Sequence, residues 1–209
     1  MNQAQVAVST GAAHPAAVSS GVRRGVAVLL GSLLVAICAH VSIPLFFTPV
    51  PITLQTFAVL LLGLTLTPAT AFAALALYLI EGAAGMPVFS PHGPGGLLQL
   101  LGPTGGYLLS YPFVAALTAW MARRIGRASF APYALSAALG SLLILVCGAS
   151  WFTLVSHQPL STVLTMTVWP FLPGDALKIC AAAGLALGCF RLRNRLRGDS
   201  ADMAGGAGR

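Results

Sequence analysis

Charged side chains are scarce in this chain: they make up 7% of its 209 residues, and only four of them are acidic. Soluble domains carry charge on about a quarter of their residues. Hydrophobic residues account for 57% of the chain, and the mean hydropathy is +0.87. The composition therefore indicates an integral membrane protein with several spans. The net charge of +7 marks cytoplasmic loops and not a nucleic-acid interface, because the basic residues flank apolar runs without interleaved aromatic residues.

The motifs of several enzyme and metal-binding classes are missing. Lys178 is the only lysine, and no GxxxxGK[ST] loop leads to it, which excludes ATP hydrolysis by the P-loop route. No HExxH helix is present, and the four cysteines lie in apolar runs without CxxC spacing. A serine nucleophile with a histidine base stays open, although no spacing supports it. We expect a protein that is not an enzyme and that binds no cofactor or metal.

Six apolar runs have about the length needed to cross a bilayer, and they predict an all-α membrane protein. These runs cover about residues 22–43, 52–66, 69–83, 107–121, 133–155 and 173–190. Three arginine clusters lie before the first run, between the fourth and fifth, and after the last. Six crossings from a cytoplasmic N-terminus place all three clusters in the cytoplasm, as the positive-inside rule requires. Both termini are therefore predicted to be cytoplasmic.

The two ends of the chain differ from the part between them. Residues 1–20 are rich in Ala, Ser, Val and Gly without clear periodicity, and residues 198–209 are rich in Gly and Ala. We predict disordered tails for both segments. The six-helix membrane domain is predicted to span residues 21–197.

Three charged residues lie within the membrane part of the chain: Glu81, Asp175 and Lys178. Inserting a charged side chain of this kind at the bilayer centre costs roughly 2.5 to 3.5 kcal/mol of free energy. Asp175 and Lys178 are three residues apart, so they share a helix face and can neutralise each other. Pro173 and Gly174 suit a helix start, where the dipole favours an anion. The pair is predicted at the external mouth of the bundle, where it suits a small polar solute; a purely structural ion pair is the alternative.

Two predicted external loops carry Pro and Gly together with aromatic residues. They cover residues 45–51, with Phe46 and Phe47, and residues 85–104, with Phe89. A Gly-rich connection of about 20 residues is unusual for an ordinary loop. Irregular backbone at membrane depth is tolerated where it is buried in protein or lines a cavity. We expect these loops to cap a ligand pocket as a lid and a wall.

Four sequence runs resemble the BioY family, the biotin-binding S components of energy-coupling factor (ECF) transporters. They are VPITLQTFAVLLLG, YLIEGAAGMPVF, GPTGGYLLSY and FLPGDALK, and they begin at Val50, Tyr78, Gly102 and Phe171. The resemblance implies six helices, a biotin pocket near the external face, and biotin uptake across a bacterial or archaeal cytoplasmic membrane. It also implies separate partners: a transmembrane coupling (T) subunit and two cytoplasmic ATPases. A solitary ion-coupled vitamin carrier that acts without ATPases stays open as the alternative.

The same resemblance assigns the ligand contacts. Asp175 and Lys178 match the family's acid and lysine at the start of the last helix, and Ser90 stands where some members have a polar contact. Leu101 replaces a residue that is basic in some members, which leaves the partner of biotin's carboxylate open. The predicted substrate-binding residues are Asp175, Lys178, Gly106, Thr104, Tyr107, Ser90 and Gln55.

Individual roles are predicted for the neutral residues of this set. Gly106 lets the backbone approach the ligand closely, and Thr104 and Tyr107 flank it. Gln55 and Thr53 either cap the second helix or hold the first loop over the pocket.

Three further predictions concern residues outside the predicted ligand contacts. Glu81 is expected to fix loop geometry. Trp151 and Trp169 are expected to anchor the chain at the external interface. Small residues at Ala27/Gly31 and Ser32/Ala36 are predicted to form the docking face for the coupling subunit.

Overall fold

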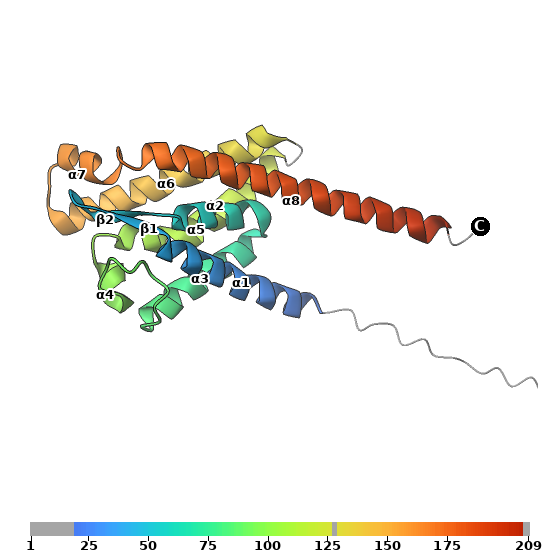
Figure 1. The fold of residues 1–209 in the computed structure, drawn as a ribbon, viewed down its shortest axis with the longest axis horizontal. Helices are drawn as coiled ribbons and strands as arrows, with labels where there is room; N and C mark the ends of the chain where they lie inside the picture. Colours follow the sequence, from blue (N-terminus) through green and yellow to red (C-terminus); the bar gives the residue numbers. More distant parts are fainter. Residues whose placement is uncertain (1–18, 127–128, 207–209) are drawn as a thin grey trace, which may run out of the picture.

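The computed structural model describes residues 19–126 and 129–206, and these ranges contain eight helices and one β-hairpin. The elements are α1 (Ser20–His40), β1 (Ser42–Leu45), β2 (Thr48–Thr53), α2 (Gln55–Thr65), α3 (Pro68–Ala83), α4 (Gly96–Leu101), α5 (Gly105–Ile125), α6 (Phe130–Ser156), α7 (Leu160–Thr167) and α8 (Leu172–Gly206). The six predicted spans correspond to α1, α2, α3, α5, α6 and α8. The start of α1 and the end of α8 lie at the same end of the molecule (Figure 1).

Two of these helices, α1 and α6, are long and apolar enough to cross a membrane by themselves. The pair α7 and α8, bent by 48° at the break between them, forms a third candidate span. Apolar helices α2 and α3 are shorter, at 11 and 16 residues. The predominantly helical membrane fold is confirmed, whereas six crossings and cytoplasmic termini stay predictions.

The first predicted external loop is a β-hairpin, so the all-α prediction needs a small correction. Strands β1 and β2 pair antiparallel, with Ser42 opposite Thr53 and Ile43 opposite Ile52. Both strands of a two-stranded sheet are edge strands, which tolerate proline. The prolines in SIPL and TPVPIT, which favoured a loop from sequence, are therefore compatible with this hairpin.

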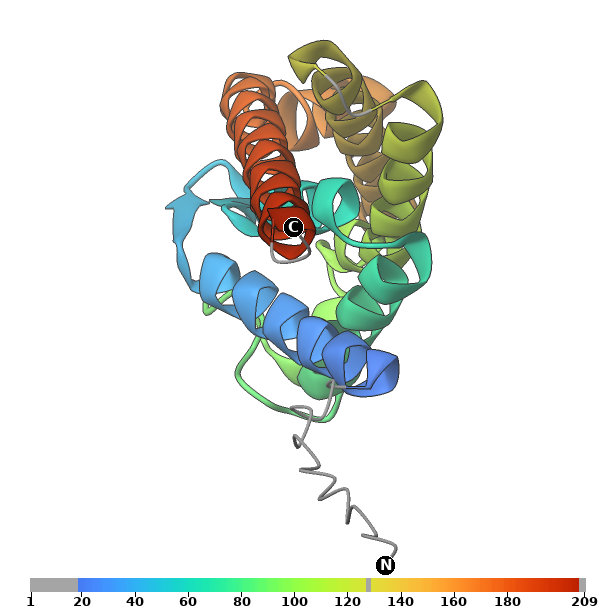
Figure 2. The ribbon, with the colours of Figure 1, turned by 90° about the vertical axis from the view of Figure 1, so that its right-hand side faces the viewer.

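Helix α2 occupies the middle of the bundle and contacts α1, α5, α6 and α8 (Figure 2). Close helix approach at small residues makes this arrangement possible. A Cβ atom built on Gly63 would lie 2.9 Å from the Cβ of Thr118 on α5. The short helix α2 can therefore pack closely against several longer helices at once.

The small-residue face of α1 packs inside the chain, against α3. A Cβ atom built on Gly31 would lie 2.8 Å from the Cβ of Ala74, and Ser32 and Ala36 are buried. The prediction that this face docks the coupling subunit is therefore wrong, because α3 already covers it. The exposed face of α1 carries larger apolar side chains such as Leu33 and Ile37.

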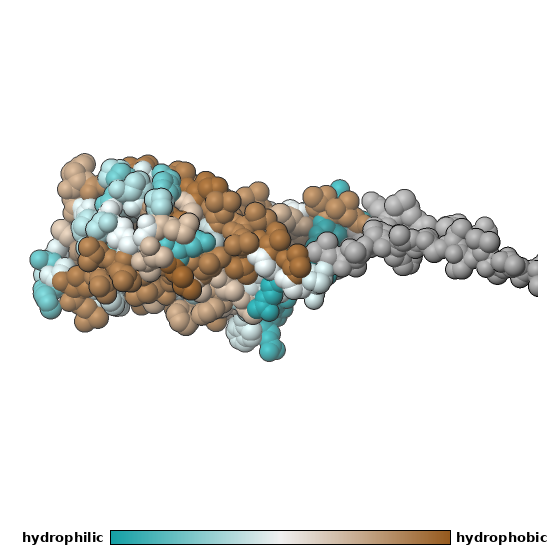
Figure 3. All heavy atoms as spheres, turned by 90° about the horizontal axis from the view of Figure 1, so that it is seen from below, coloured by the Kyte–Doolittle hydropathy of each residue, from teal (hydrophilic) through white to brown (hydrophobic). Residues whose placement is uncertain are grey.

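Much of the molecular surface is apolar, as expected for contact with lipid. Exposed large hydrophobic residues occur on every long helix, including Phe113, Leu142 and Leu177. Figure 3 shows one face that is hydrophobic over most of its area, with hydrophilic groups towards its two ends. This distribution fits a bundle whose middle faces hydrocarbon.

The structure describes little of the predicted N-terminal tail and most of the predicted C-terminal tail. Residues 1–18 lie outside the described residues. At the other end, α8 continues to Gly206, through most of the segment predicted as a disordered tail. An α-helix propagates at low cost once it has formed, so it can continue through residues of low helix propensity such as Gly198 and Asp199. Helix α8 passes residue 197 without a break, and the domain boundary there stays a prediction.

Candidate functional site

A cavity opens at the end of the bundle where the hairpin, α4 and α7 lie. Its empty volume is about 550 Å³, including the part open to solvent. Six of the seven predicted binding residues line it: Gln55, Ser90, Thr104, Tyr107, Asp175 and Lys178. They come from α2, α5, α8 and the segment between α3 and α4, so the fold brings distant parts of the chain together. Buried Val50 and Pro51 of β2 form part of the wall.

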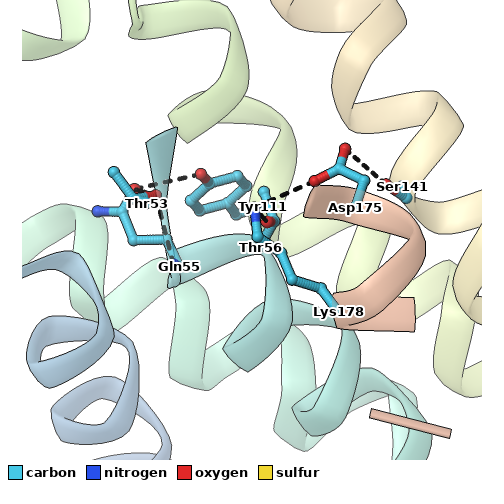
Figure 4. Close-up of polar contacts among 7 residues, drawn as sticks. All are labelled: Thr53, Gln55, Thr56, Tyr111, Ser141, Asp175 and Lys178. Atoms are coloured by element: carbon cyan, nitrogen blue, oxygen red, sulfur yellow. Dashed lines mark hydrogen bonds and ion pairs between the residues drawn. The ribbon is translucent and has the colours of Figure 1, made fainter. Parts of the chain in front are cut away.

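Asp175 and Lys178 form an ion pair in this cavity (Figure 4). Lys178 Nζ donates to Asp175 Oδ1 at 3.1 Å and to Thr56 Oγ1 at 3.0 Å. Ser141 Oγ donates to Asp175 Oδ2 at 3.1 Å. The Lys178 side chain is only 10% exposed and that of Asp175 only 6%, so each charge depends on these hydrogen-bond partners. An ammonium has three N–H donors, which leaves one for a ligand.

Gln55 connects the hairpin to two helices through its side chain. Its Nε2 donates to the Tyr78 hydroxyl of α3 at 2.7 Å. Its Oε1 accepts from the Tyr111 hydroxyl of α5 and from Thr53 Oγ1 of β2, both at 3.3 Å. The contacts agree with both alternatives predicted for Gln55 and Thr53. Thr53 Oγ1 accepts from the backbone N–H of Gln55 at the start of α2 at 3.3 Å, and the Gln55 side chain reaches Thr53 of the hairpin.

A second polar group comes from the Gly-rich segment and α4. Gln99 Nε2 donates to Thr104 Oγ1 at 3.0 Å, and Gln99 Oε1 accepts from the backbone N–H of Gly95 at 3.3 Å. Ser90 also lines the cavity, and its buried Oγ has no hydrogen-bond partner within the described part of the chain. An unpaired buried hydroxyl is costly, which makes Ser90 a natural contact for a polar ligand atom.

Tyr107 and Gly106, neighbours on α5, have different surroundings. Tyr107 lines the cavity, and its hydroxyl donates to the Thr167 carbonyl of α7 at 2.8 Å. Gly106 is not among the lining residues. A Cβ atom built on Gly106 would lie 2.6 Å from the Cys147 carbonyl oxygen of α6 and still closer to Trp151. The close approach at Gly106 in this structure is to α6, and a contact between Gly106 and a ligand stays a prediction.

The residues predicted to lie outside the ligand contacts, Glu81, Trp151 and Trp169, are not among those that line the cavity. Glu81 accepts a hydrogen bond from Ser32 Oγ, which ties α3 to α1. Trp151 donates through Nε1 to the Gly102 carbonyl at 2.9 Å and so fixes the turn before α5. Trp169 is 62% exposed, as an interfacial anchor would be.

Sequence reasoning missed several residues of the site. Thr56, Gln99 and Tyr111 line the cavity, and Ser141 supports Asp175 from α6. Tyr111 could have been found, because it lies four residues after Tyr107 on the same helix face. Thr56 and Ser141 carry no such signal, since their positions depend on how α2 and α6 pack against α8.

The cavity combines one buried ion pair, several neutral polar groups and aromatic walls. The rings of Tyr107 and Phe171 lie 6.4 Å apart, and both line it. Within residues 19–126 and 129–206, no group of three His, Cys, Asp or Glu side chains could hold a metal ion. The site is built to hold a small organic molecule by hydrogen bonds and apolar contact.

The family model described as "BioY family" matches residues 7–195. The chain belongs to the BioY family. The biotin transporter BioY2 of Lactococcus lactis subsp. cremoris is 33% identical over 162 residues, which are 77% of this chain and 87% of that protein. The biotin transporter BioY of Thermotoga maritima is 35% identical over 154 residues, which are 74% and 88% of the two chains.

A solved structure supports the BioY assignment at the level of the fold. It is the crystal structure of the S-component for biotin from an ECF-type ABC transporter. It aligns with a TM-score of 0.75 at 26% identity, over 85% of this chain and 95% of that one. The BioY relatives named here are transporters and not enzymes.

Proposed function

We propose that this BioY-family chain captures biotin with high affinity at the external face and takes it up across the cytoplasmic membrane of a bacterium or archaeon. It would act as the S component of an ECF-type transporter, energised by a separate coupling (T) subunit and two cytoplasmic ATPases. The observation that carries the proposal is the buried Asp175–Lys178 pair in a cavity with polar and aromatic lining, within a BioY-family chain.

The chemistry of the cavity suits biotin. The ureido ring of biotin offers two N–H donors and one carbonyl acceptor. The Asp175 carboxylate accepts from the donors, and the free N–H of Lys178 donates to an acceptor. Ser90, Thr104 and Gln55 supply further neutral polar contacts, and Tyr107 and Phe171 supply apolar surface.

Nanomolar affinity is within reach of one enclosed pocket. It corresponds to about 12 kcal/mol of binding free energy. Spread over the roughly 16 heavy atoms of biotin, this is about 0.75 kcal/mol per atom, below the ceiling of about 1.5 for the best small ligands.

The proposed topology is a multi-pass bundle of six crossings with both termini in the cytoplasm. Arg123 and Arg124 lie in the last turn of α5, and Arg191 lies on α8. Helix α8 emerges from the end of the bundle away from the hairpin, α4 and α7 (Figure 1). The positive-inside rule assigns that end to the cytoplasm, which makes the cavity external. The hairpin and the segment 85–104 would then act as lid and wall over it.

Equilibrium binding of labelled biotin to the detergent-purified chain, without ATP or partners, tests the capture role. We expect one-to-one binding that is lost in Lys178→Met. A well-folded wild-type chain that does not bind biotin would overturn the assigned ligand, and other vitamins would then be screened.

Reconstitution in vesicles separates the two energising mechanisms. We expect biotin uptake only when the coupling subunit and ATPases are present with ATP. Uptake by the chain alone along an ion gradient would instead support the solitary carrier.

A further inference from the structure

A second cavity lies at the opposite end of three helices that build the first one. It is lined by Leu64 and Thr65 of α2, Tyr133 of α6, and Ala186, Phe190 and Arg193 of α8. Its empty volume is about 320 Å³, including the part open to solvent. We call it the inner cleft.

The inner cleft has a mixed lining, in which Leu64, Ala186 and Phe190 lie beside the polar Thr65, and it has a cation at its mouth. Leu64 and Ala186 are almost fully buried, Phe190 is half-buried, and Arg193 is exposed. The two carboxylates whose side chains the structure describes are occupied elsewhere: Glu81 bonds Ser32, and Asp175 pairs with Lys178. The guanidinium of Arg193 therefore has no carboxylate partner within the described side chains.

The depth of Arg193 follows from the continuous helix α8. It lies 18 residues after Asp175, which at about 1.5 Å per residue is about 27 Å along the axis. The hydrocarbon core of a bilayer is about 30 Å thick. With the cavity at one face of the membrane, Arg193 reaches the headgroup level of the other face. Arg123, at the end of α5, donates to the Leu66 carbonyl just after α2 and marks the same level.

We propose that the inner cleft binds one anionic phospholipid of the cytoplasmic leaflet. Its phosphate pairs with Arg193, and an acyl chain packs against the half-buried ring of Phe190. The cation favours an anionic headgroup over a zwitterionic one. The exposed part of the Phe190 ring favours a lipid over a soluble phosphate, because only a lipid brings a chain to cover it. A lipid bound there would touch α2, α6 and α8 together, opposite the site at which Lys178 bonds Thr56.

Native mass spectrometry of the detergent-purified full chain tests the proposal with phosphatidylglycerol and phosphatidylcholine of identical acyl chains. One basic residue near an anionic headgroup contributes about 1 kcal/mol, so phosphatidylglycerol should be retained about fivefold better. Arg193→Gln should abolish this preference. Arg191→Gln and Arg195→Gln are the matched controls, since residues two positions away point to the opposite side of the helix. Both should keep the preference.

Two further experiments identify the molecule that binds in the inner cleft. Phe190→Ala should weaken retention of both lipids, because it removes apolar wall without changing charge. Glycerol phosphate, which has the headgroup and no chain, should not displace phosphatidylglycerol. Equal retention of the two lipids by the wild type, an Arg191→Gln effect as large as that of Arg193→Gln, or displacement by glycerol phosphate would each overturn the proposal. Size-exclusion profiles and thermal unfolding confirm that each variant is folded.

Discussion

The two cavities share helices α2, α6 and α8 but place their charges in opposite ways. The cavity that holds Asp175 and Lys178, called the outer cavity below, keeps both members of an ion pair inside, where Thr56 and Ser141 complete their hydrogen bonds. The inner cleft has a mixed lining that includes Thr65 and Phe190, and it carries Arg193 at the exposed rim. A charge inside the protein requires directed partners, whereas one at the rim remains solvated. The outer cavity therefore suits a ligand with defined hydrogen-bonding edges, and the inner cleft suits a headgroup recognised mainly by its charge.

The largest expected difference is in stability, between a variant that lacks the Lys178 cation and one that lacks the Arg193 cation. Lys178→Met leaves the buried Asp175 carboxylate without its counter-charge, which costs roughly 3 to 5 kcal/mol for a buried pair. Arg193→Met removes an exposed charge and should change stability by less than about 0.5 kcal/mol. Thermal unfolding of the two variants in detergent measures the difference. Equal shifts would mean that the two cations do not differ in burial as described.

Packing between α5 and α6 gives the next effect. Gly106→Ala should lower the unfolding midpoint, because the new methyl group meets the Cys147 carbonyl and Trp151; overpacking of this kind costs about 1 to 3 kcal/mol. Gly184→Ala on α8 is the matched control, since a Cβ atom there meets nothing within 4 Å. The control should be neutral or slightly stabilising, as alanine favours helix. If the Gly106→Ala variant is as stable as the wild type but binds the ligand more weakly, the result would support the predicted contact between Gly106 and the ligand.

A smaller effect is expected from the unpaired hydroxyl in the outer cavity. Ser90→Ala should leave the stability of the empty protein unchanged or slightly higher, because the lost hydroxyl has no partner within the described residues. Biotin should bind roughly two- to tenfold more weakly, which is the worth of one neutral hydrogen bond. Isothermal titration of the variant beside the wild type measures this. Unchanged affinity would remove Ser90 from the ligand contacts.

The charged part of the site could be predicted from sequence because it depends on local rules. Asp175 and Lys178 share a helix face at a helix start, and charge is so scarce that their pairing stands out. Helix α3 was predicted to within a residue, since Thr67 caps it and Pro68 begins it. Tyr107 and Thr104 followed from the family-like run that contains them.

The rest depends on how helices pack, which spacing does not encode. The hydroxyls of Thr56 and Ser141 belong to the site only because α2 and α6 meet α8 there. Gly106 and the small residues of α1 were assigned to a ligand and a partner, yet both serve contacts within the chain. Small residues permit close approach without specifying what approaches.

The outer cavity, and not the inner cleft, is expected to bind biotin. Equilibrium binding of labelled biotin to the purified wild type, Asp175→Asn and Arg193→Gln compares the two sites in one assay. Asp175→Asn keeps the shape of the side chain and removes its charge, so affinity should fall roughly 10- to 100-fold, as expected for hydrogen bonds to a charged group. Arg193→Gln should bind like the wild type. Unchanged affinity in a folded Asp175→Asn variant, or a comparable loss in Arg193→Gln, would contradict the account.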